Sequence, residues 1–315
     1  MSKTLLSAPG ARVRSIDHLV DAACLDRELV EYLLAEASVM EGVLAEPEAA
    51  PLRNRILATL FFEPSTRTRL SFEAAMLRLG GQVLSAADPA GMSATKGESL
   101  EDTIRVVGGY ADAIVLRHPE VGSAARAARV SPVPVINGGD GTGQHPTQAL
   151  LDLYTIKKEL GRLDHLRIGL AGDLKHGRTV HSLALLLALF DGNEITLIAP
   201  PGLGLPADTK EALVARKAVF RETAELEPAV LTLDVLYQTR LQRERLNGVV
   251  ARAPARVDSR LLGLMQSHAI LMHPLPRVEE IDPAVDGDSR AAYFRQAQNG
   301  LPVRMAILHW LICGR

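Results

Sequence analysis

Short apolar runs alternate with longer segments of helical periodicity along most of this 315-residue chain. Strands that are separated by helices in this way pair in parallel, and the helices cover the faces of the sheet. The length exceeds what a single hydrophobic core usually serves. We therefore predict an α/β fold of two domains, each a mainly parallel sheet flanked by helices. The apolar runs expected to form strands are 56–62, 113–116, 133–136, 167–171, 194–198, 233–237 and 269–272.

The domain boundary is predicted within a helix that begins near Thr147. The strand–helix alternation restarts at Arg167, after a charged stretch that includes Lys157 and Glu159. We expect a first domain over residues 1–147 and a second over 148–289, with a C-terminal helix in 290–315 that packs back on the first. The segments expected to be helical are 16–44, 68–79, 99–110, 147–160, 180–190 and 302–313.

Composition and motifs exclude several classes of function. A net charge of −2 gives no footprint for nucleic acid or for an anionic membrane. Two cysteines, Cys24 and Cys313, are too few for a disulfide scaffold or an iron–sulfur cluster. No metal-ligand spacing accompanies the histidines. The glycines of 138–143 match neither a nucleotide-binding nor a dinucleotide-binding loop, and we expect them to form a flexible turn that leads to His145 and Gln148. We expect no metal, no cofactor, no signal peptide and a cytoplasmic location.

Polar side chains follow six of the expected strands. The carboxyl ends of parallel strands meet at one edge of a sheet, where ligands of open α/β sheets bind. Arginine, histidine, glutamine and hydroxyl side chains gathered at that edge favour an anion-binding crevice. The segments that carry them are 63–69, 117–119, 138–148, 173–178, 238–242 and 273–277.

Ser65-Thr66-Arg67-Thr68 is the strongest local pattern. Hydroxyl side chains at a helix start often serve only as caps. Two or three of them around an arginine also bring hydroxyl donors, backbone N–H groups and a guanidinium together, which favours phosphate binding.

Two further segments are more ambiguous. His145 and Gln148 lie three residues apart in the first turn of the expected helix and share one face, although a lone histidine there more often packs or caps. The stretch with Ser93 and Lys96 is predicted to be an exposed loop, either merely solvated or functional.

The motifs FFEPSTRTR, RHP, HPTQ, GDLKHGR, TRLQRER and HPLPR occur in this order along the chain. Together they resemble the aspartate/ornithine carbamoyltransferase family over essentially its whole length. The resemblance implies transfer of a carbamoyl group from carbamoyl phosphate to the amino group of a second substrate. With L-aspartate, the products are N-carbamoyl-L-aspartate and phosphate, in pyrimidine biosynthesis.

The second substrate is expected to be aspartate. Its two carboxylates need cations, which Arg178 and Arg240 with Gln242 can offer. Ornithine enzymes carry an HCLP motif, whereas this chain has Pro274 at the cysteine position, and its single tryptophan, Trp310, lies outside their tryptophan-containing loop. A carbamoyltransferase for another amino acid is the alternative within the class. A non-catalytic subunit of a larger assembly is the alternative outside it.

The resemblance also implies roles for individual residues. Thr68, Arg117 and His145 would donate to the carbonyl oxygen, and we interpret His145 as an oxyanion donor rather than a general base. Gln148 and the Leu275 main chain would hold the amino group. The phosphate would be bound by Ser65, Thr66, Arg67 and Thr68. The aspartate carboxylates would be bound by Arg178, Arg240 and Gln242, with Pro276 nearby after a cis Leu275–Pro276 peptide.

Two implications concern assembly and motion. Ser93 and Lys96 match a loop that enters the active site of the adjacent subunit, so a homotrimer with shared sites is expected, and Lys96 would act in catalysis and aspartate binding. Glu63, Arg178 and Arg245 could form charge bridges when the domains close over substrate, the alternative being surface ion pairs of little energetic worth. Regulatory chains or a dihydroorotase are possible further partners.

Overall fold

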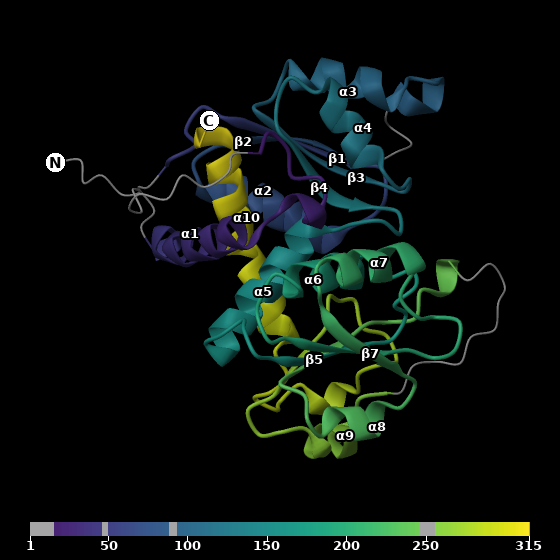
Figure 1. Ribbon diagram of the computed structural model, residues 1–315. Helices are drawn as coiled ribbons and strands as arrows, with labels where there is room; N and C mark the ends of the chain where they lie inside the picture. Colours follow the sequence, from purple (N-terminus) through teal and green to yellow (C-terminus); the bar gives the residue numbers. More distant parts are fainter. Residues whose placement is uncertain (1–15, 46–49, 88–92, 246–255, 315) are drawn as a thin grey trace.

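The computed structural model describes residues 16–45, 50–87, 93–245 and 256–314. Its ribbon is divided into two halves, each built round one parallel sheet (Figure 1). The predicted α/β class, with two mainly parallel sheets flanked by helices, is therefore confirmed. Each of the seven expected strands lies at or near its predicted position.

The first sheet has the strand order β2-β1-β3-β4, and every pair is parallel. Successive residues of its central strands point into different cores, so Val115 packs with α1 and α2 while Ile114 packs with α3 and α4. Its strands are β1 (Ile56–Phe61), β2 (Gln82–Ala86), β3 (Ala113–His118) and β4 (Val135–Asp140). Its helical elements are η1 (Ala22–Cys24), α1 (Arg27–Ala45), α2 (Thr66–Arg78), η3 (Ser93–Lys96), α3 (Leu100–Gly108) and α4 (Ser123–Val130).

The second sheet has the order β7-β6-β5-β8-β9, again parallel throughout. Its strands are β5 (Arg167–Ala171), β6 (Glu194–Ile198), β7 (Val219–Thr223), β8 (Val235–Gln238) and β9 (Ile270–Met272). Its helical elements are α6 (Arg178–Leu187), α7 (Ala207–Ala215), α8 (Leu226–Val230), η4 (Arg243–Arg245), α9 (Ser259–Leu264) and η5 (Pro283–Val285).

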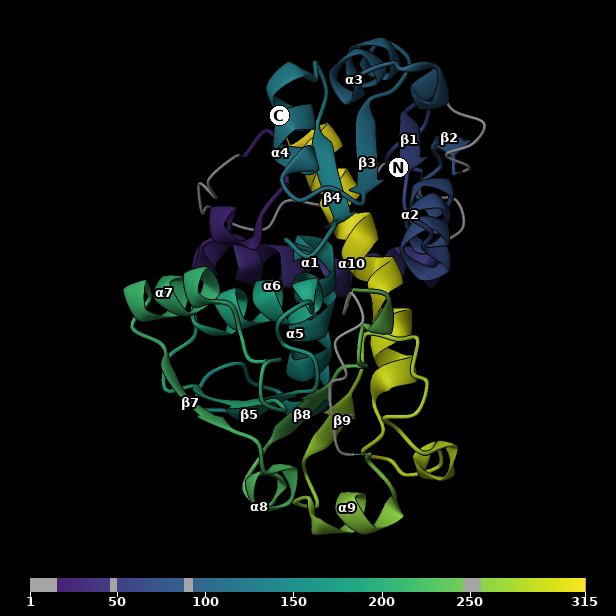
Figure 2. The same cartoon turned by 90° about the vertical axis from the view of Figure 1, so that its right-hand side faces the viewer.

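Two helices join the halves. Helix α5 (Pro146–Leu160) follows β4 of the first sheet and leads to β5 of the second, so the boundary predicted after residue 147 falls in its first turn. Helix α10 (Tyr293–Cys313) runs from beside the second sheet to the first, where it packs against α1 and α2 as well as α5 (Figure 2). The halves are thus linked by packed helices as well as by the chain.

Three local expectations need correction. The loop expected at 138–143 is partly strand, because β4 continues to Asp140. The last helix, Tyr293–Cys313, lies within the expected range 290–315, but it begins well before residue 302, where the helical pattern was expected to start, and it passes through Pro302. Strands β2 and β7 were not expected. Both lie at sheet edges with mostly exposed or half-buried side chains, so their sequences lack the apolar runs of the central strands.

Candidate active site

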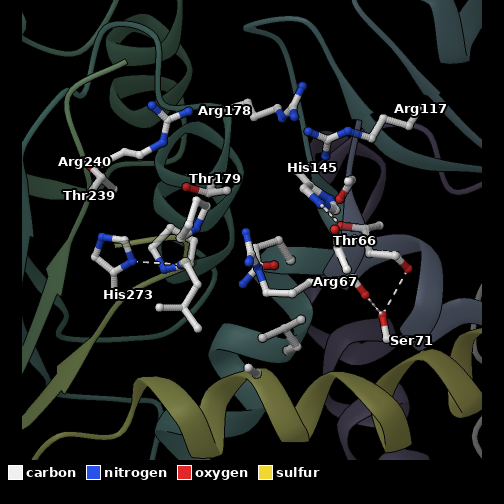
Figure 3. Close-up of a pocket in the computed structure, with 18 of the residues that line it drawn as sticks. Thr66, Arg67, Ser71, Arg117, His145, Arg178, Thr179, Thr239, Arg240 and His273 are labelled. Atoms are coloured by element: carbon white, nitrogen blue, oxygen red, sulfur yellow. Dashed lines mark hydrogen bonds between the residues drawn. The ribbon is translucent and has the colours of Figure 1, made fainter. Parts of the chain in front are cut away.

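A cavity of about 500 Å³ lies between the two halves, lined by residues that follow strands of both sheets (Figure 3). This volume suits small ligands. The predicted site residues other than Ser93 and Lys96 all line it. They are Ser65, Thr66, Arg67, Thr68, Arg117, His145, Gln148, Arg178, Arg240, Gln242, Leu275 and Pro276.

Three helices begin at the cavity wall: α2 after Ser65, α5 after His145 and α6 after Gly177. Their N-termini present backbone N–H groups and the positive ends of the helix dipoles. Ser65 occupies the N-cap position of α2, but its side chain makes no capping hydrogen bond. Simple capping therefore does not account for this serine, and its hydroxyl remains available to a ligand.

One carboxylate holds three guanidinium groups together at the cavity. Oε2 of Glu63 lies 2.9 Å from Arg178 Nη1 and 3.2 Å from Arg117 Nη2, and Oε1 lies 3.1 Å from Arg245 Nη2. Arg178 and Arg245 also donate to the carbonyl oxygen of Gly141, at 2.8 and 2.7 Å. The bridges expected between Glu63, Arg178 and Arg245 are thus formed in the structure.

The Glu63 bridges differ from ordinary surface ion pairs. Burial tends to raise the pKa of Glu63, but Arg178, Arg117 and Arg245 outweigh burial and hold it below the usual range. The side chains of Arg117 and Arg178 are only 11% and 10% exposed. Pairs this well shielded are little screened by solvent, so the alternative of weak surface pairing does not apply.

Positive charge dominates the cavity. Among the described lining residues Glu63 is the one acid, whereas five arginines contribute. Burial, and then neighbouring Arg178, lower the pKa of Arg117 to about 9, and burial followed by Arg240 lowers the pKa of Arg67. Arginine side chains that are buried away from water and repel one another favour the entry of an anion. The five are Arg67, Arg117, Arg178, Arg240 and Arg304.

His145 lies at the junction of the two halves and is buried. Its ring nitrogens face hydroxyl groups, with Nε2 3.4 Å from Thr68 Oγ1 and Nδ1 3.4 Å from Thr147 Oγ1. Burial, and then Arg178 and Arg117, hold the pKa of His145 well below the ordinary histidine value of 6.5. The imidazole is therefore neutral near pH 7 and can act as an uncharged N–H donor.

The wall from the second half carries the remaining predicted residues. The Leu275–Pro276 peptide is cis, as the resemblance implied, and Leu275 N donates to His273 Nδ1 at 2.8 Å. Gln242 is held in place because its Nε2 donates to the carbonyl oxygen of His176 at 2.7 Å. Figure 3 shows Arg240 and His273 on this side, opposite Arg67 and Thr66.

Ser93 and Lys96 lie apart from these residues. Both belong to η3, and Lys96 does not line the cavity of this chain. Lys96 is exposed, and of Ser93 only the backbone is described. Any cavity on which Lys96 acts is therefore not the one formed by its own chain.

Sequence reasoning missed several lining residues, notably Gln296 and Arg304 of α10. Arg304 is 3% exposed, its guanidinium lies 5.1 Å from the Phe72 ring centre, and its Nε has no hydrogen-bond partner in the described chain. Its one detectable signal is a single charge within the apolar stretch that ends the chain. Gln296 carried no signal. The other lining residues missed are Ser71, Leu151, Thr179 and Ala297. Pro64, Gly177, Thr239, His273 and Pro274 also line the cavity and lie within the segments predicted to form the crevice, although they were not named individually as site residues.

The described residues form neither a metal-binding cluster nor a membrane-spanning helix. Over the residues that the structure describes, no three histidine, cysteine, aspartate or glutamate side chains are grouped so that they could hold a metal ion. No helix in the same ranges is both long and apolar enough to cross a bilayer.

Comparisons with known proteins agree with these motifs. Residues 17–158 match the family model for the aspartate/ornithine carbamoyltransferase carbamoyl-P binding domain, and residues 164–311 match that for the Asp/Orn binding domain. The chain is 52% identical over 296 residues to the aspartate carbamoyltransferase catalytic subunit of Archaeoglobus fulgidus, covering 92% of this chain and 97% of that one.

Two further likenesses extend over nearly the whole chain. It is 48% identical over 306 residues to chloroplastic aspartate carbamoyltransferase 3 of Pisum sativum, covering 95% of this chain and 78% of the relative. It is also similar to the crystal structure of Trypanosoma cruzi aspartate transcarbamoylase in complex with N-(phosphonacetyl)-L-aspartic acid. That likeness has a TM-score of 0.89 at 41% identity and covers 94% of this chain and 96% of that one.

Proposed function

This chain belongs to the aspartate/ornithine carbamoyltransferase family, and on that premise we propose that its cavity holds carbamoyl phosphate and L-aspartate side by side. The enzyme transfers the carbamoyl group to the amino group of L-aspartate, giving N-carbamoyl-L-aspartate and phosphate in pyrimidine biosynthesis. The observation that carries the proposal is a cavity with five arginines and one acid among its described lining residues, placed where three helices begin.

We assign the phosphate to the start of α2. Ser65, Thr66 and Thr68 offer hydroxyl and backbone donors there, and Arg67 adds a charged fork. The uncapped hydroxyl of Ser65 supports this assignment. Arg304, buried and with an unpaired Nε, adds positive charge to the same wall.

We assign the carbonyl oxygen of carbamoyl phosphate to Thr68, Arg117 and His145. The aspartate nitrogen attacks the carbonyl carbon, negative charge develops on this oxygen, and the bond from carbon to the phosphate oxygen then breaks. Fixed donors aimed at the developing charge lower the barrier. The departing phosphate takes the proton that the amine loses. A neutral His145 fits the role of donor and leaves the base to phosphate.

We assign the aspartate carboxylates to Arg178, Arg240 and Gln242, near Pro276. Arg178 already binds Glu63 and Gly141, so one of its edges is engaged in holding the halves together. In this arrangement the closed cavity brings the two substrates into contact, which supplies much of the rate enhancement. Residues 1–147 with the C-terminal helix would bind carbamoyl phosphate, and 148–289 would bind aspartate.

The same proposal includes a cytoplasmic homotrimer, although the pea relative is named as chloroplastic. Lys96 is exposed and lies outside the cavity of its own chain. In a trimer with cyclic symmetry, η3 of one protomer can complete the cavity of the next, where Lys96 would meet aspartate and the reacting groups. Regulatory chains or a dihydroorotase would bind outside this trimer.

A colorimetric ureido assay with carbamoyl phosphate and either L-aspartate or L-ornithine tests the reaction, and a native mass measurement tests the assembly. We expect ureido product with aspartate only, and a mass of three chains. Product from ornithine would overturn the substrate assignment, whereas a monomeric mass with full activity would overturn the shared site alone.

A further inference from the structure

A fully buried carboxylate lies directly behind the cavity, in helix α5. Asp152 has no exposed surface and does not line the cavity. It lies one helical turn after Gln148, so the two side chains share a face of α5. Burying a carboxylate is costly unless hydrogen bonds replace its hydration, which raises the question of what this one holds in place.

Three side chains from three elements donate to Asp152. Gln148 Nε2 of α5 lies 2.9 Å from Oδ1, and Gln296 Nε2 of α10 lies 2.7 Å from the same oxygen. The hydroxyl of Tyr237 in β8 lies 2.8 Å from Oδ2. The carboxylate therefore joins the helix that links the halves, a strand of the second sheet and the C-terminal helix.

These contacts fix the orientation of the side-chain amides of Gln148 and Gln296. A carboxamide has one donor group and one acceptor oxygen. Because the NH₂ group of Gln148 is committed to Asp152, its Oε1 is left as an acceptor, and Gln148 lines the cavity. In Gln296 the NH₂ group is likewise committed, and its Oε1 accepts from His273 N at 2.9 Å.

The second contact reaches the loop that carries Leu275. His273 begins this loop, and its Nδ1 accepts a hydrogen bond from Leu275 N at 2.8 Å. A connected path of hydrogen bonds thus runs from Asp152 through Gln296 and His273 to Leu275. In the proposed function, Gln148 and the Leu275 main chain hold the amino group of carbamoyl phosphate. Both of the groups proposed to hold that amino group are therefore tied to one carboxylate.

We propose that Asp152 is a positioning residue that presents acceptor oxygens to the amino group of carbamoyl phosphate and so makes the site select a carbamoyl over an acetyl group. The inference rests on the proposed function, because it takes the substrate's position from there. An amino group offers two N–H donors where a methyl group offers none. Without Asp152 the Gln148 amide is free to rotate and to present its own NH₂ group, which repels a donor.

The test measures the dissociation constants of carbamoyl phosphate, acetyl phosphate and inorganic phosphate by calorimetry on the full-length protein. Asp152→Leu removes the acceptor at similar size, and Asp152→Ala is carried alongside in case the leucine side chain prevents folding. We expect carbamoyl phosphate to bind roughly tenfold more weakly, and acetyl phosphate and phosphate to change by less than about twofold. Asp152→Asn keeps an acceptor oxygen for both amides and should restore the carbamoyl preference to within about threefold.

Thr155→Val is the matched control. Thr155 lies in the same helix, is buried, and accepts a hydrogen bond from Asn299 Nδ2 of α10 at 3.0 Å, but it does not line the cavity. Its loss should lower thermal stability without changing the ratio of the carbamoyl and acetyl phosphate constants. An equal loss of all three ligands in Asp152→Leu or Asp152→Ala would overturn the proposal, as would an unchanged ratio.

Gln148→Ala separates the two levels of inference. If it abolishes the carbamoyl preference while the Asp152 variants keep it, the positioning role is wrong and the proposed role of Gln148 stands. If Gln148→Ala itself leaves the preference intact, the role of Gln148 fails and the inference about Asp152 fails with it. The ureido assay with the parent protein tests the reaction independently of both.

Discussion

Arg178 Nη1 donates to Glu63 Oε2 at 2.9 Å across the space between the two sheets. Glu63 follows β1 of the first sheet, and Arg178 begins α6 of the second half. Arg245, from η4, binds the other oxygen of the same carboxylate. Glu63 of the first half thus forms ion pairs with two arginines of the second half, and the proposed substrates would lie beside these ion pairs.

Glu63→Gln should therefore weaken closure. Removing the charge leaves Arg117, Arg178 and Arg245 without their shared partner, and breaking a buried ion pair is strongly destabilising. We expect kcat/KM for aspartate to fall by about tenfold to a hundredfold, with a smaller change in carbamoyl phosphate affinity. Steady-state kinetics measure this, and small-angle scattering with and without N-(phosphonacetyl)-L-aspartate measures closure.

The control for this variant is Glu73→Gln. Glu73 belongs to α2 and accepts hydrogen bonds from Thr59 and Ser85, outside the cavity. It should leave both measurements near those of the parent. Unchanged aspartate kinetics in Glu63→Gln would show that the ion pairs of Glu63 have no part in turnover.

His145→Ala should act on turnover rather than on aspartate binding. Losing one fixed donor to a developing oxyanion costs about 10²- to 10³-fold in kcat. The KM for aspartate should change only a few-fold, because His145 is assigned to the other substrate. His181→Ala is the matched control, since His181 is also buried but binds the carbonyl oxygen of Leu174 outside the cavity. Weaker aspartate binding with intact turnover would contradict the donor role.

Mixing two inactive variants tests the shared site. Lys96→Ala keeps the cavity residues, and Arg67→Ala keeps η3, so a hybrid trimer contains some sites with both parts intact. Random reassembly should restore about a quarter of the parent's sites. Activity of unmixed and remixed samples measures this. Hybrids as inactive as both starting variants would exclude sharing of sites between protomers.

Asp152 should make stability depend on pH. Burial outweighs the hydrogen bonds from Gln296, Tyr237 and Gln148 and raises its pKa from 3.8 to about 7, while Arg304 of α10 acts weakly in the opposite direction. A raised folded-state pKa means that the folded protein binds the proton more tightly than the unfolded chain does. The associated stability is complete below the unfolded pKa and is lost as the pH rises through the folded one.

The comparison with Asp152→Asn isolates this contribution. The unfolding free energy of the parent, relative to that of the asparagine variant, should fall by up to about 4 kcal/mol from acid to neutral pH. Thermal unfolding at about pH 5 and about pH 8, at one protein concentration, measures the trend. The ionisable side chains that face Asp152 are Tyr237 of β8 and Arg304 of α10. If the unfolding free energy of the parent instead rises with pH relative to that of the asparagine variant, the pKa of Asp152 is not raised.

The sequence allowed the centre of each sheet to be predicted better than its edges. Strands such as Ala113–His118 are buried on both faces, so they appear as continuous apolar runs. Strand β7 pairs on one side only, and the exposed Val219 and Arg221 flank the half-buried Phe220, which leaves no buried apolar run. The helical pattern of α10 was predicted only from residue 302 onward, because proline is tolerated in the first turn of a helix but rarely lies in its interior.

The site followed a similar rule. Residues at or just after the carboxyl ends of strands, such as Arg67, Arg117 and Arg240, could be found because parallel strands bring their ends to one place. Gln296 and Arg304 reach the cavity from the first turn and the middle of α10, where only the packing of this helix decides which side chains face inward. Asp152 carried no local signal either, since two of its three partners come from β8 and α10, far along the chain.

The path of α10 has a consequence for biosynthesis. The helix is made after all the strands of both sheets that the structure describes, yet buried residues such as Val303 and Ile307 complete the core that α1 and α2 share. A nascent chain that has emerged only as far as β9 leaves the sides of both helices that contact α10 exposed to water. Its first sheet must therefore wait until residues 293–313 have left the ribosome before it can reach its final stability, although its own strands were completed long before.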